Sequence, residues 1–295
     1  MTNHLTLRDY AIAAMMNLMW GLNLIAVKEG INHLSPLTAA WLRQTVVLLI
    51  CLPALKIIPG KMRDLLWLGL FSGVIFYILT NLALSVSTNV AALAIAGQLG
   101  SPVAVILGVI FLGETIHKRR IAGMLLAFAG VAIIVFDPAA LDERLGLIIT
   151  AAGGVVWGIC SFIQRRLAGV PLLSIFAWMG LIGSLGLLPI ALAFEPGQMR
   201  ALPSVPLSTF GWILFSALGS TIMGQGAMSL LLRRHPLSTV VPVTLLAPVI
   251  AVITSSLYFG TPMTPLMILG GLIALTGVAI VTIRTARVRD IEGQL

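Results

Sequence analysis

The chain has 295 residues, of which 59% are hydrophobic and only 9% are charged, and its mean hydropathy is +1.06. This composition lies far from that of soluble domains, so the sequence indicates a protein embedded in a lipid bilayer. The formal net charge of +8 does not indicate a nucleic-acid-binding protein, because the basic residues fall in short segments between apolar runs. No nucleic-acid partner is therefore expected.

Ten apolar runs follow one another along the chain, each roughly 20 residues long, which is the length that a membrane-spanning helix needs. They cover residues 9–27, 36–55, 64–83, 88–112, 118–136, 145–163, 171–193, 209–232, 237–259 and 265–283. The sequence thus predicts an all-α integral membrane protein with ten transmembrane helices.

The distribution of Lys and Arg predicts the orientation of these helices. If the N-terminus is cytoplasmic, fourteen of the eighteen basic residues fall in cytoplasmic segments. Lys28, Arg144 and Arg200 then lie outside, and Arg43 lies within the second run. Because Lys and Arg in short loops resist translocation, we expect both termini to be cytoplasmic.

Similar residues recur in the same order in the two halves of the chain. The Trp20-Gly21 pair of the first run is matched by Trp157-Gly158 of the sixth run, and a Gly-Val-Ala-Ile sequence starts at both Gly130 and Gly277. We therefore predict two repeats of five helices, residues 1–137 and 138–295. Five is an odd number, so the second repeat enters the membrane from the opposite side, and such inverted repeats are typical of secondary transporters.

The sequence contains no motif for catalysis, metal binding or nucleotide hydrolysis. Cys51 and Cys160 lie in separate apolar runs, and the four histidines lie in the N-terminal tail or in loops. The phosphate-binding lysine motif is absent, and no pair of carboxylates lies in the middle of an apolar run. We expect no metal, no cofactor and no enzymatic activity.

Two further segments, SPVAVILGVIFLGE at 101–114 and IAGMLLAFAGVAIIV at 121–135, resemble the EamA type of the drug/metabolite transporter superfamily. Together with the ten runs and the repeated Trp-Gly pair, this resemblance covers nearly the whole chain. It is greatest to bacterial exporters of amino acids and metabolites. The second half departs from the family pattern, because Gly260-Thr261 replaces the Gly113-Glu114 pair of the first half. We expect Glu114 to cap a helix or to pair with a nearby basic residue.

Polar and aromatic side chains within the apolar runs are candidates for lining a substrate cavity, because polar groups facing lipid are energetically costly. The candidates are Trp20, Asn23, Arg43, Tyr77, Asn81, Gln98, Trp157, Ser161, Gln225 and Thr244. The two tryptophans could instead only pack against neighbouring helices. Arg43 could extend to the outer interface, bind helix-end carbonyls or bind a substrate carboxylate. Gln98 and Thr244 each precede a proline, which frees a carbonyl or bends the helix.

These observations together predict a secondary transporter of a bacterial inner membrane that exports amino acids or similar small metabolites by alternating access. Its partners would be a small-molecule substrate and the lipid bilayer, and either a monomer or a homodimer is compatible with the sequence. A transporter of drugs, quaternary amines or nucleotide sugars is an alternative within the same superfamily. A channel or a structural membrane protein is a further alternative, although the charge rings and carbonyl filters of channels are absent from the sequence.

Overall fold

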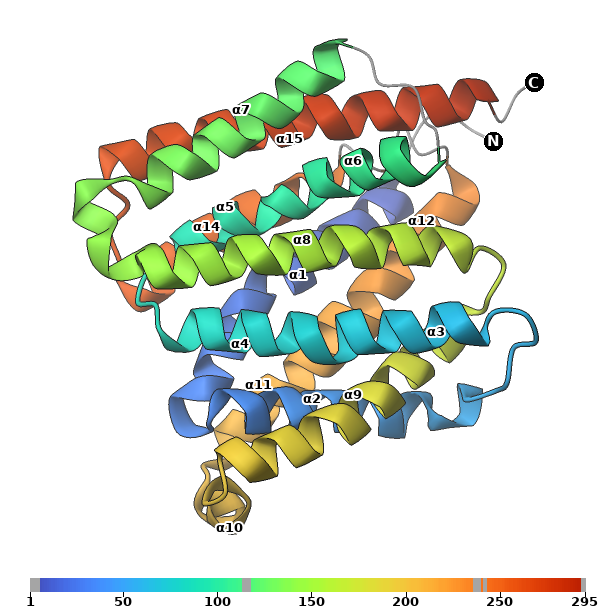
Figure 1. The fold of residues 1–295 in the computed structure, drawn as a ribbon, viewed down its shortest axis with the longest axis vertical. Helices are drawn as coiled ribbons and strands as arrows, with labels where there is room; N and C mark the ends of the chain where they lie inside the picture. The colour runs from blue at the N-terminus through green and yellow to red at the C-terminus, as the bar shows by residue number, and fades with distance from the viewer. Residues whose placement is uncertain (1–5, 113–117, 236–239, 241–242, 293–295) are drawn as a thin grey trace.

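The structure is a computed structural model that describes residues 6–112, 118–235, 240 and 243–292. All regular structure in these residues is helical (Figure 1). The predicted role of Glu114 falls outside the described residues.

The first half of the chain contains two uninterrupted long helices and two continuous series of helical segments whose winding changes midway. We call each such series a rod and number it by its place among the long helices of its half. The uninterrupted helices are α1 (Leu7–His33) and α7 (Lys118–Val135), and α2 (Pro36–Cys51) ends in the 3₁₀ turn η1 (Leu52–Ala54). The third rod consists of α3 (Met62–Leu68), the π-helical segment η2 (Gly69–Ile75) and α4 (Phe76–Ser85). The fourth rod consists of α5 (Val90–Ala96), the 3₁₀ turn η3 (Gly97–Leu99) and α6 (Gly100–Leu112).

The second half follows a similar plan. It contains α8 (Arg144–Arg166), α9 (Leu172–Phe194), the short α10 (Gln198–Ala201), α14 (Leu246–Phe259) and α15 (Pro265–Glu292). Between α10 and α14 lies a rod of α11 (Leu207–Phe215), the π-helical segment η6 (Ser216–Gly224) and α12 (Gln225–Arg234). Short 3₁₀ turns, η4 (Pro138–Glu143) and η5 (Leu202–Ser204), lie in the connections.

Seven helical stretches among the described residues are long and apolar enough to cross a membrane. Three shorter apolar helices, Ile121–Val135, Leu246–Phe259 and Pro265–Ile280, occupy the remaining predicted runs. The all-helical fold is therefore confirmed. That all ten runs cross the bilayer stays a prediction.

The helices run roughly along one direction, and the start of α1 and the end of α15 lie at the same end of the bundle (Figure 1). We call this end the termini end and the other the distal end. Two tightly packed pairs, α2 with α9 and α7 with α15, lie at opposite edges of the molecule, while α1, α4, α8 and α14 lie between them (Figure 1).

Several helix starts are stabilised by side chains from distant parts of the chain. The carboxylate of Glu195 accepts the backbone N–H groups of Leu37 and Thr38 at 2.9 and 2.8 Å. Glu143 similarly accepts the N–H groups of Thr88 and Asn89. Because the first N–H groups of a helix have no partner within the helix, Glu195 satisfies donors of α2 that would otherwise be unpaired, while Glu143 binds the two residues that precede α5.

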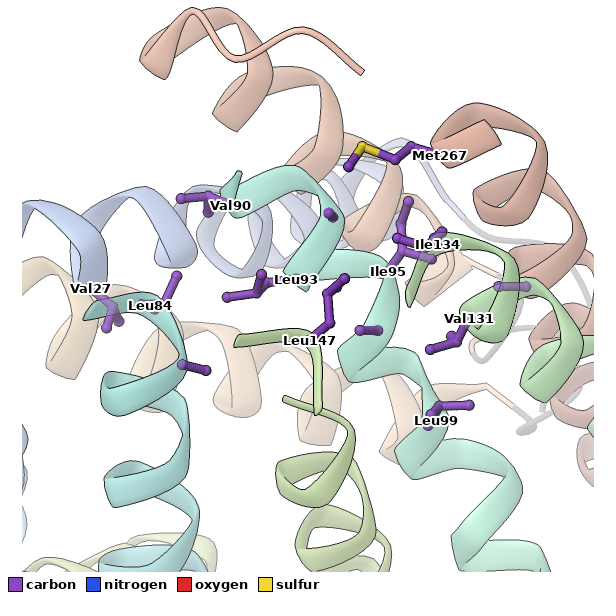
Figure 2. Close-up of a cluster of buried hydrophobic side chains, with 14 residues drawn as sticks. Val27, Leu84, Val90, Leu93, Ile95, Leu99, Val131, Ile134, Leu147 and Met267 are labelled. Atoms are coloured by element: carbon purple, nitrogen blue, oxygen red, sulfur yellow. The ribbon is translucent and has the colours of Figure 1, made fainter. Parts of the chain in front are cut away.

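The largest hydrophobic core lies toward the distal end and is built around α5, in which every residue is buried (Figure 2). Val90, Leu93 and Ile95 of this helix belong to one cluster with Leu147 of α8 and Ile134 of α7, and Figure 2 shows Leu93 beside Leu147 and Ile95 beside Ile134. Helices of both halves thus share one core, and α5 is shielded from lipid over its whole length.

Helices α7 and α15 approach each other through glycines placed equivalently in the two helices. A Cβ atom added at Gly130 would lie 2.5 Å from the carbonyl oxygen of Gly270, and one added at Gly277 would lie 2.5 Å from that of Gly123. Such distances are far below van der Waals contact, so only glycine permits this approach. Small residues at the contact allow the backbones themselves to pack, which is a common source of helix association in membranes.

The π-helical segments η2 and η6 occupy the third rod of each half. Wide turns of this kind leave backbone carbonyls without the usual intrahelical partner and are frequent at functional sites. Side chains from neighbouring helices bind these carbonyls: Gln44 Nε2 donates to Gly73 O at 3.1 Å, and Trp20 Nε1 donates to Ser220 O at 3.1 Å.

Candidate functional site

An open cavity of about 620 Å³ lies at the termini end of the bundle. Its walls are η1, the first residues of α9, and one face of η6 and α12 that carries Ile222, Gly226, Ser229 and Leu230. The wall is mostly apolar, with Lys56, Ser174 and Ser229 as its polar or charged side chains.

The cavity exists because η6 and α12 diverge from α2 toward the termini end. At the distal end, α11 and η6 pack against both α1 and α2. Farther along, α12 packs against α1, and the cavity separates it from the end of α2 and the start of α9. Among the described residues, the cavity therefore opens at the termini end, whereas α11 and η6 pack against α1 and α2 at the distal end.

The closed part is held by a cluster of polar side chains around Arg43, which is only 5% exposed. Arg43 Nε donates to Ser216 Oγ at 2.7 Å, and Arg43 Nη2 donates to Thr221 Oγ1 at 2.8 Å and to Ser216 O at 3.2 Å. Ser216 Oγ in turn donates to Asn23 Oδ1 at 2.7 Å. The cluster thus links α1, α2 and η6 by hydrogen bonds. Arg43 binds its neighbours and does not extend to the interface.

Aromatic rings continue from this cluster into the other half of the molecule. The guanidinium carbon of Arg43 lies 4.2 Å from the ring centroid of Tyr77, a cation–π arrangement. Tyr77 contacts Phe76 edge to face at 5.5 Å, and Phe76 packs against Trp157 at 5.2 Å. Trp20 lies on the other side of the cluster, where its ring packs against Gly224 of η6.

The remaining predicted residues have more local surroundings. Asn81 is buried, donates to Pro36 O at 2.8 Å, and lines a cavity of about 10 Å³ together with Arg43 and Ser216. Gln98 Nε2 and Ser161 Oγ donate to carbonyls of their own helices, those of Ala94 at 3.4 Å and Trp157 at 2.9 Å. Gln225 is half-buried at the start of α12, and Thr244 is half-buried two residues before α14.

The structure therefore brings together Asn23, Arg43, Tyr77 and Asn81, and Trp20 of α1 lies nearby, where it binds η6. It does not place Gln98 or Ser161 in this cluster, and that Gln98 and Thr244 contact one substrate stays a prediction. Sequence reasoning missed Ser216, which is the centre of the cluster. A signal was present, because a Phe-Ser pair follows Trp67 at Phe71-Ser72 and follows Trp212 at Phe215-Ser216.

The described part of the chain contains no candidate site for metal binding or for reactive thiol chemistry. No three His, Cys, Asp or Glu side chains there lie close enough to hold a metal ion. Cys51 and Cys160 are free and buried, in the apolar cluster formed by α2, α3, α8 and α9.

Curated proteins similar over most of their length include two named as probable amino-acid metabolite efflux pumps. That of Escherichia coli K12 is 25% identical over 92% of this chain and 94% of its own, and that of Salmonella typhimurium LT2 is 26% identical over 95% and 98%. A probable terminal-alkyne amino-acid exporter of Streptantibioticus cattleyicolor is 27% identical over 61% of this chain and 60% of its own.

A solved crystal structure that is 19% identical covers 96% of this chain and 99% of its own, with a TM-score of 0.61, so the same fold occurs in an experimentally determined protein. The family model for EamA-like transporters matches the chain twice, at residues 9–136 and 144–283. With its apolar helices, its cavity and these two matches, the chain belongs to the EamA-like transporter family and is a multi-pass membrane transporter.

Proposed function

We propose that the protein is a secondary transporter that exports amino acids or similar small metabolites by alternating access. The observation that carries this proposal is the asymmetry of the bundle, in which a cavity of about 620 Å³ opens at one end and the Arg43 cluster closes the other. A transporter that alternates between two openings must have such one-sided states. The printed names of the full-length relatives support amino acids and related metabolites as the substrate class.

The two halves, residues 1–137 and 138–295, act as inverted repeats in this proposal. In support, equivalent glycines make equivalent contacts across the halves. A Cβ at Gly21 would lie 2.8 Å from Ile250 Cβ, and one at Gly158 would lie 2.9 Å from Val103 Cβ. The π-helical segments in the third rod of each half and the paired glycines of α7 and α15 are further support.

The termini end faces the cytoplasm of a bacterial cell in this proposal, with the protein in the inner membrane. The support is that the segments at this end carry most of the Lys and Arg residues. The present conformation would then receive substrate from the cytoplasm, and release would require the Arg43 cluster at the distal end to open.

The chemistry of the Arg43 cluster favours small zwitterions over highly charged substrates. The candidate lining carries aromatic rings, amides and hydroxyls with a single guanidinium, whereas phosphorylated substrates call for several basic groups. We place Trp20, Asn23, Arg43, Tyr77 and Asn81 nearest the substrate. The more distant candidates are Gln98, Trp157, Ser161, Gln225 and Thr244.

The test is counterflow of each radiolabelled standard amino acid into proteoliposomes preloaded with the same unlabelled compound. We expect saturable flux for a subset of them and loss of this flux in Gly226→Trp. Gly226 lines the cavity, and a Cβ there has no atom within 4 Å, so the indole can fill the cavity without displacing backbone. Gly211→Trp is the matched control, because its Cβ also meets nothing within 4 Å but Gly211 does not line the cavity.

Flux that rises linearly with concentration would contradict alternating access and favour a channel. If quaternary amines or nucleotide sugars show saturable flux and no amino acid does, those compounds are the substrates and the proposed class of amino acids is wrong. Equal fluxes in Gly226→Trp and Gly211→Trp would show that the cavity is not on the transport route.

A further inference from the structure

Arg43 is a buried cation that lacks a counter-ion. Its side chain is 5% exposed, and no carboxylate pairs with it within the ranges that the structure describes. A guanidinium has five N–H donors. Here Nε and Nη2 donate to two hydroxyls and one carbonyl, while buried Nη1 has no acceptor among the described residues.

This arrangement is energetically expensive. Burying a charge costs several kcal/mol unless it is paired and its donors are satisfied, and neutral hydroxyls repay only part of that cost. The Tyr77 ring, whose centroid lies 4.2 Å from the guanidinium carbon, stabilises the cation through a cation–π contact but carries no net negative charge. The site therefore holds a positive charge that no carboxylate among the described residues neutralises.

A structural tie between helices would not need a charge at this position. The adjacent Gln44 ties α2 to the carbonyl of Gly73 in η2 with a neutral amide, and Arg43 ties α2 to Ser216 in η6. The second half has Gly180 at the position that corresponds to Arg43 when Trp41 is aligned with Trp178. The charge thus occurs in one half alone, which favours a role in binding over a role in the shared architecture.

The cavities nearest to this guanidinium differ in size toward the two ends of the bundle. Toward the distal end, the cavity that Arg43 lines with Asn81 and Ser216 has a volume of about 10 Å³, which suffices for a water molecule and no more. Toward the termini end, the 620 Å³ cavity is lined by Ile222, which follows Thr221 in the chain, while Thr221 and Arg43 themselves lie behind its wall.

We infer that Arg43 is the receptor for the carboxylate of the transported substrate, which enters from the cavity at the termini end and takes the place of Thr221 Oγ1 and Ser216 Oγ on the guanidinium. This inference rests on the proposed function and adds to it that a free carboxylate is required. Two parallel N–H···O bonds from a guanidinium to a carboxylate are stronger than bonds to neutral hydroxyls, so the exchange is favourable. Because Ser216 also binds Asn23, its release would loosen the contact of η6 with α1 and α2 that closes the distal end.

The test uses the standard amino acid with the largest saturable flux in the wild-type protein. Its unlabelled form, its amide and the amine left after loss of the carboxylate compete against the labelled compound in proteoliposomes. We expect the amide and the amine to compete about ten- to a hundredfold more weakly than the acid, because each lacks a charge-assisted hydrogen bond. In Arg43→Gln we expect acid and amide to compete within about twofold of each other.

Two further variants separate binding from folding. Gln44→Leu removes the neighbouring tie to η2 and should keep the wild-type preference for the acid. Thr221→Val leaves Arg43 in place and removes a competing acceptor, so the acid should compete more strongly while the amide is unchanged. An unaltered acid preference in folded Arg43→Gln, or a Thr221→Val variant with no selective gain, would overturn the inference.

A second readout does not depend on amino-acid transport. Sodium butyrate should raise the melting temperature of the purified wild-type protein above that in butylammonium chloride of equal ionic strength, and this difference should vanish in Arg43→Gln. If no amino acid shows saturable flux but butyrate stabilises selectively, the proposed function fails while the carboxylate site stands. If flux is saturable but neither assay shows selectivity for a carboxylate, the proposed transport function stands and the inference that Arg43 binds the carboxylate is wrong.

Discussion

Replacing Gly130 or Gly277 by alanine should destabilise the protein by similar amounts. A Cβ at Gly130 would lie 2.5 Å from Gly270 O and 2.7 Å from Ala274 Cα. Carbon atoms pack at about 3.5 to 4.0 Å, so the two helices must separate by about 1 Å, and this forfeits a quarter to a half of each affected dispersion contact. Overpacking of this kind typically costs about 1–3 kcal/mol. The clashing atoms belong to the backbone and cannot turn aside, so the cost should lie in the upper part of this range. Alanine gains nearly 1 kcal/mol over glycine in helix propensity, which leaves an expected net loss of roughly 1–2 kcal/mol.

The double variant distinguishes this reasoning from a general effect of alanine. One separation of α7 from α15 relieves both clashes, so the loss in Gly130→Ala/Gly277→Ala should be clearly smaller than the sum of the two single losses. The assay is thermal unfolding in detergent, where a loss of about 1–2 kcal/mol corresponds to a decrease of roughly 2–8 °C. Gly226→Ala is the control and should be neutral or stabilising, because its Cβ meets nothing within 4 Å. Additive losses, or a single variant as stable as Gly226→Ala, would refute the backbone-packing argument.

Three further substitutions test other contacts. Glu195→Gln removes the charge that binds the first N–H groups of α2 and should lower the melting temperature by an amount that corresponds to about 1 kcal/mol. Asp9→Asn removes the carboxylate that contacts His235 at 2.9 Å and so should loosen α1 from the end of α12, measurable as faster backbone hydrogen exchange in these helices. Gln98→Ala should raise KM by severalfold with little change in maximal rate if Gln98 meets the substrate, and an unchanged KM would exclude it.

The helical fold could be predicted from the sequence because it depends on the length and hydrophobicity of each apolar run. The start of α2 at Pro36 and the helical run up to Val135 follow the prediction to within a residue. The π-helical segments could not be predicted in this way, because neither η2 nor η6 contains a proline, and the side chains that bind their carbonyls come from another helix.

The candidate site was only partly predictable for the same reason. Arg43 is conspicuous in the sequence because it is the one basic residue in the middle of an apolar run. Its partners Ser216 and Thr221 follow more than 170 residues later, and no local pattern relates them to Arg43. The sequence therefore left three explanations for Arg43 open, and the structure contradicts one of them, extension to the interface.

The adjacent positions of Arg43 and Gln44 define a point about which α2 can tilt. These two residues fix α2 to η6 and to η2 respectively, so a rigid-body tilt of α2 would pivot at them. The arm from Arg43 to the end of η1 at Ala54 is roughly 16 Å long at 1.5 Å per residue, so a tilt of about 10° would move its tip by about 3 Å. Pro53 and Ala54, at this tip, form part of the cavity rim. The end of α2 at the cavity can therefore move by about the diameter of a water molecule without unwinding of α2. The bonds of Arg43 to Ser216 O and of Gln44 to Gly73 O can stay in place during this movement.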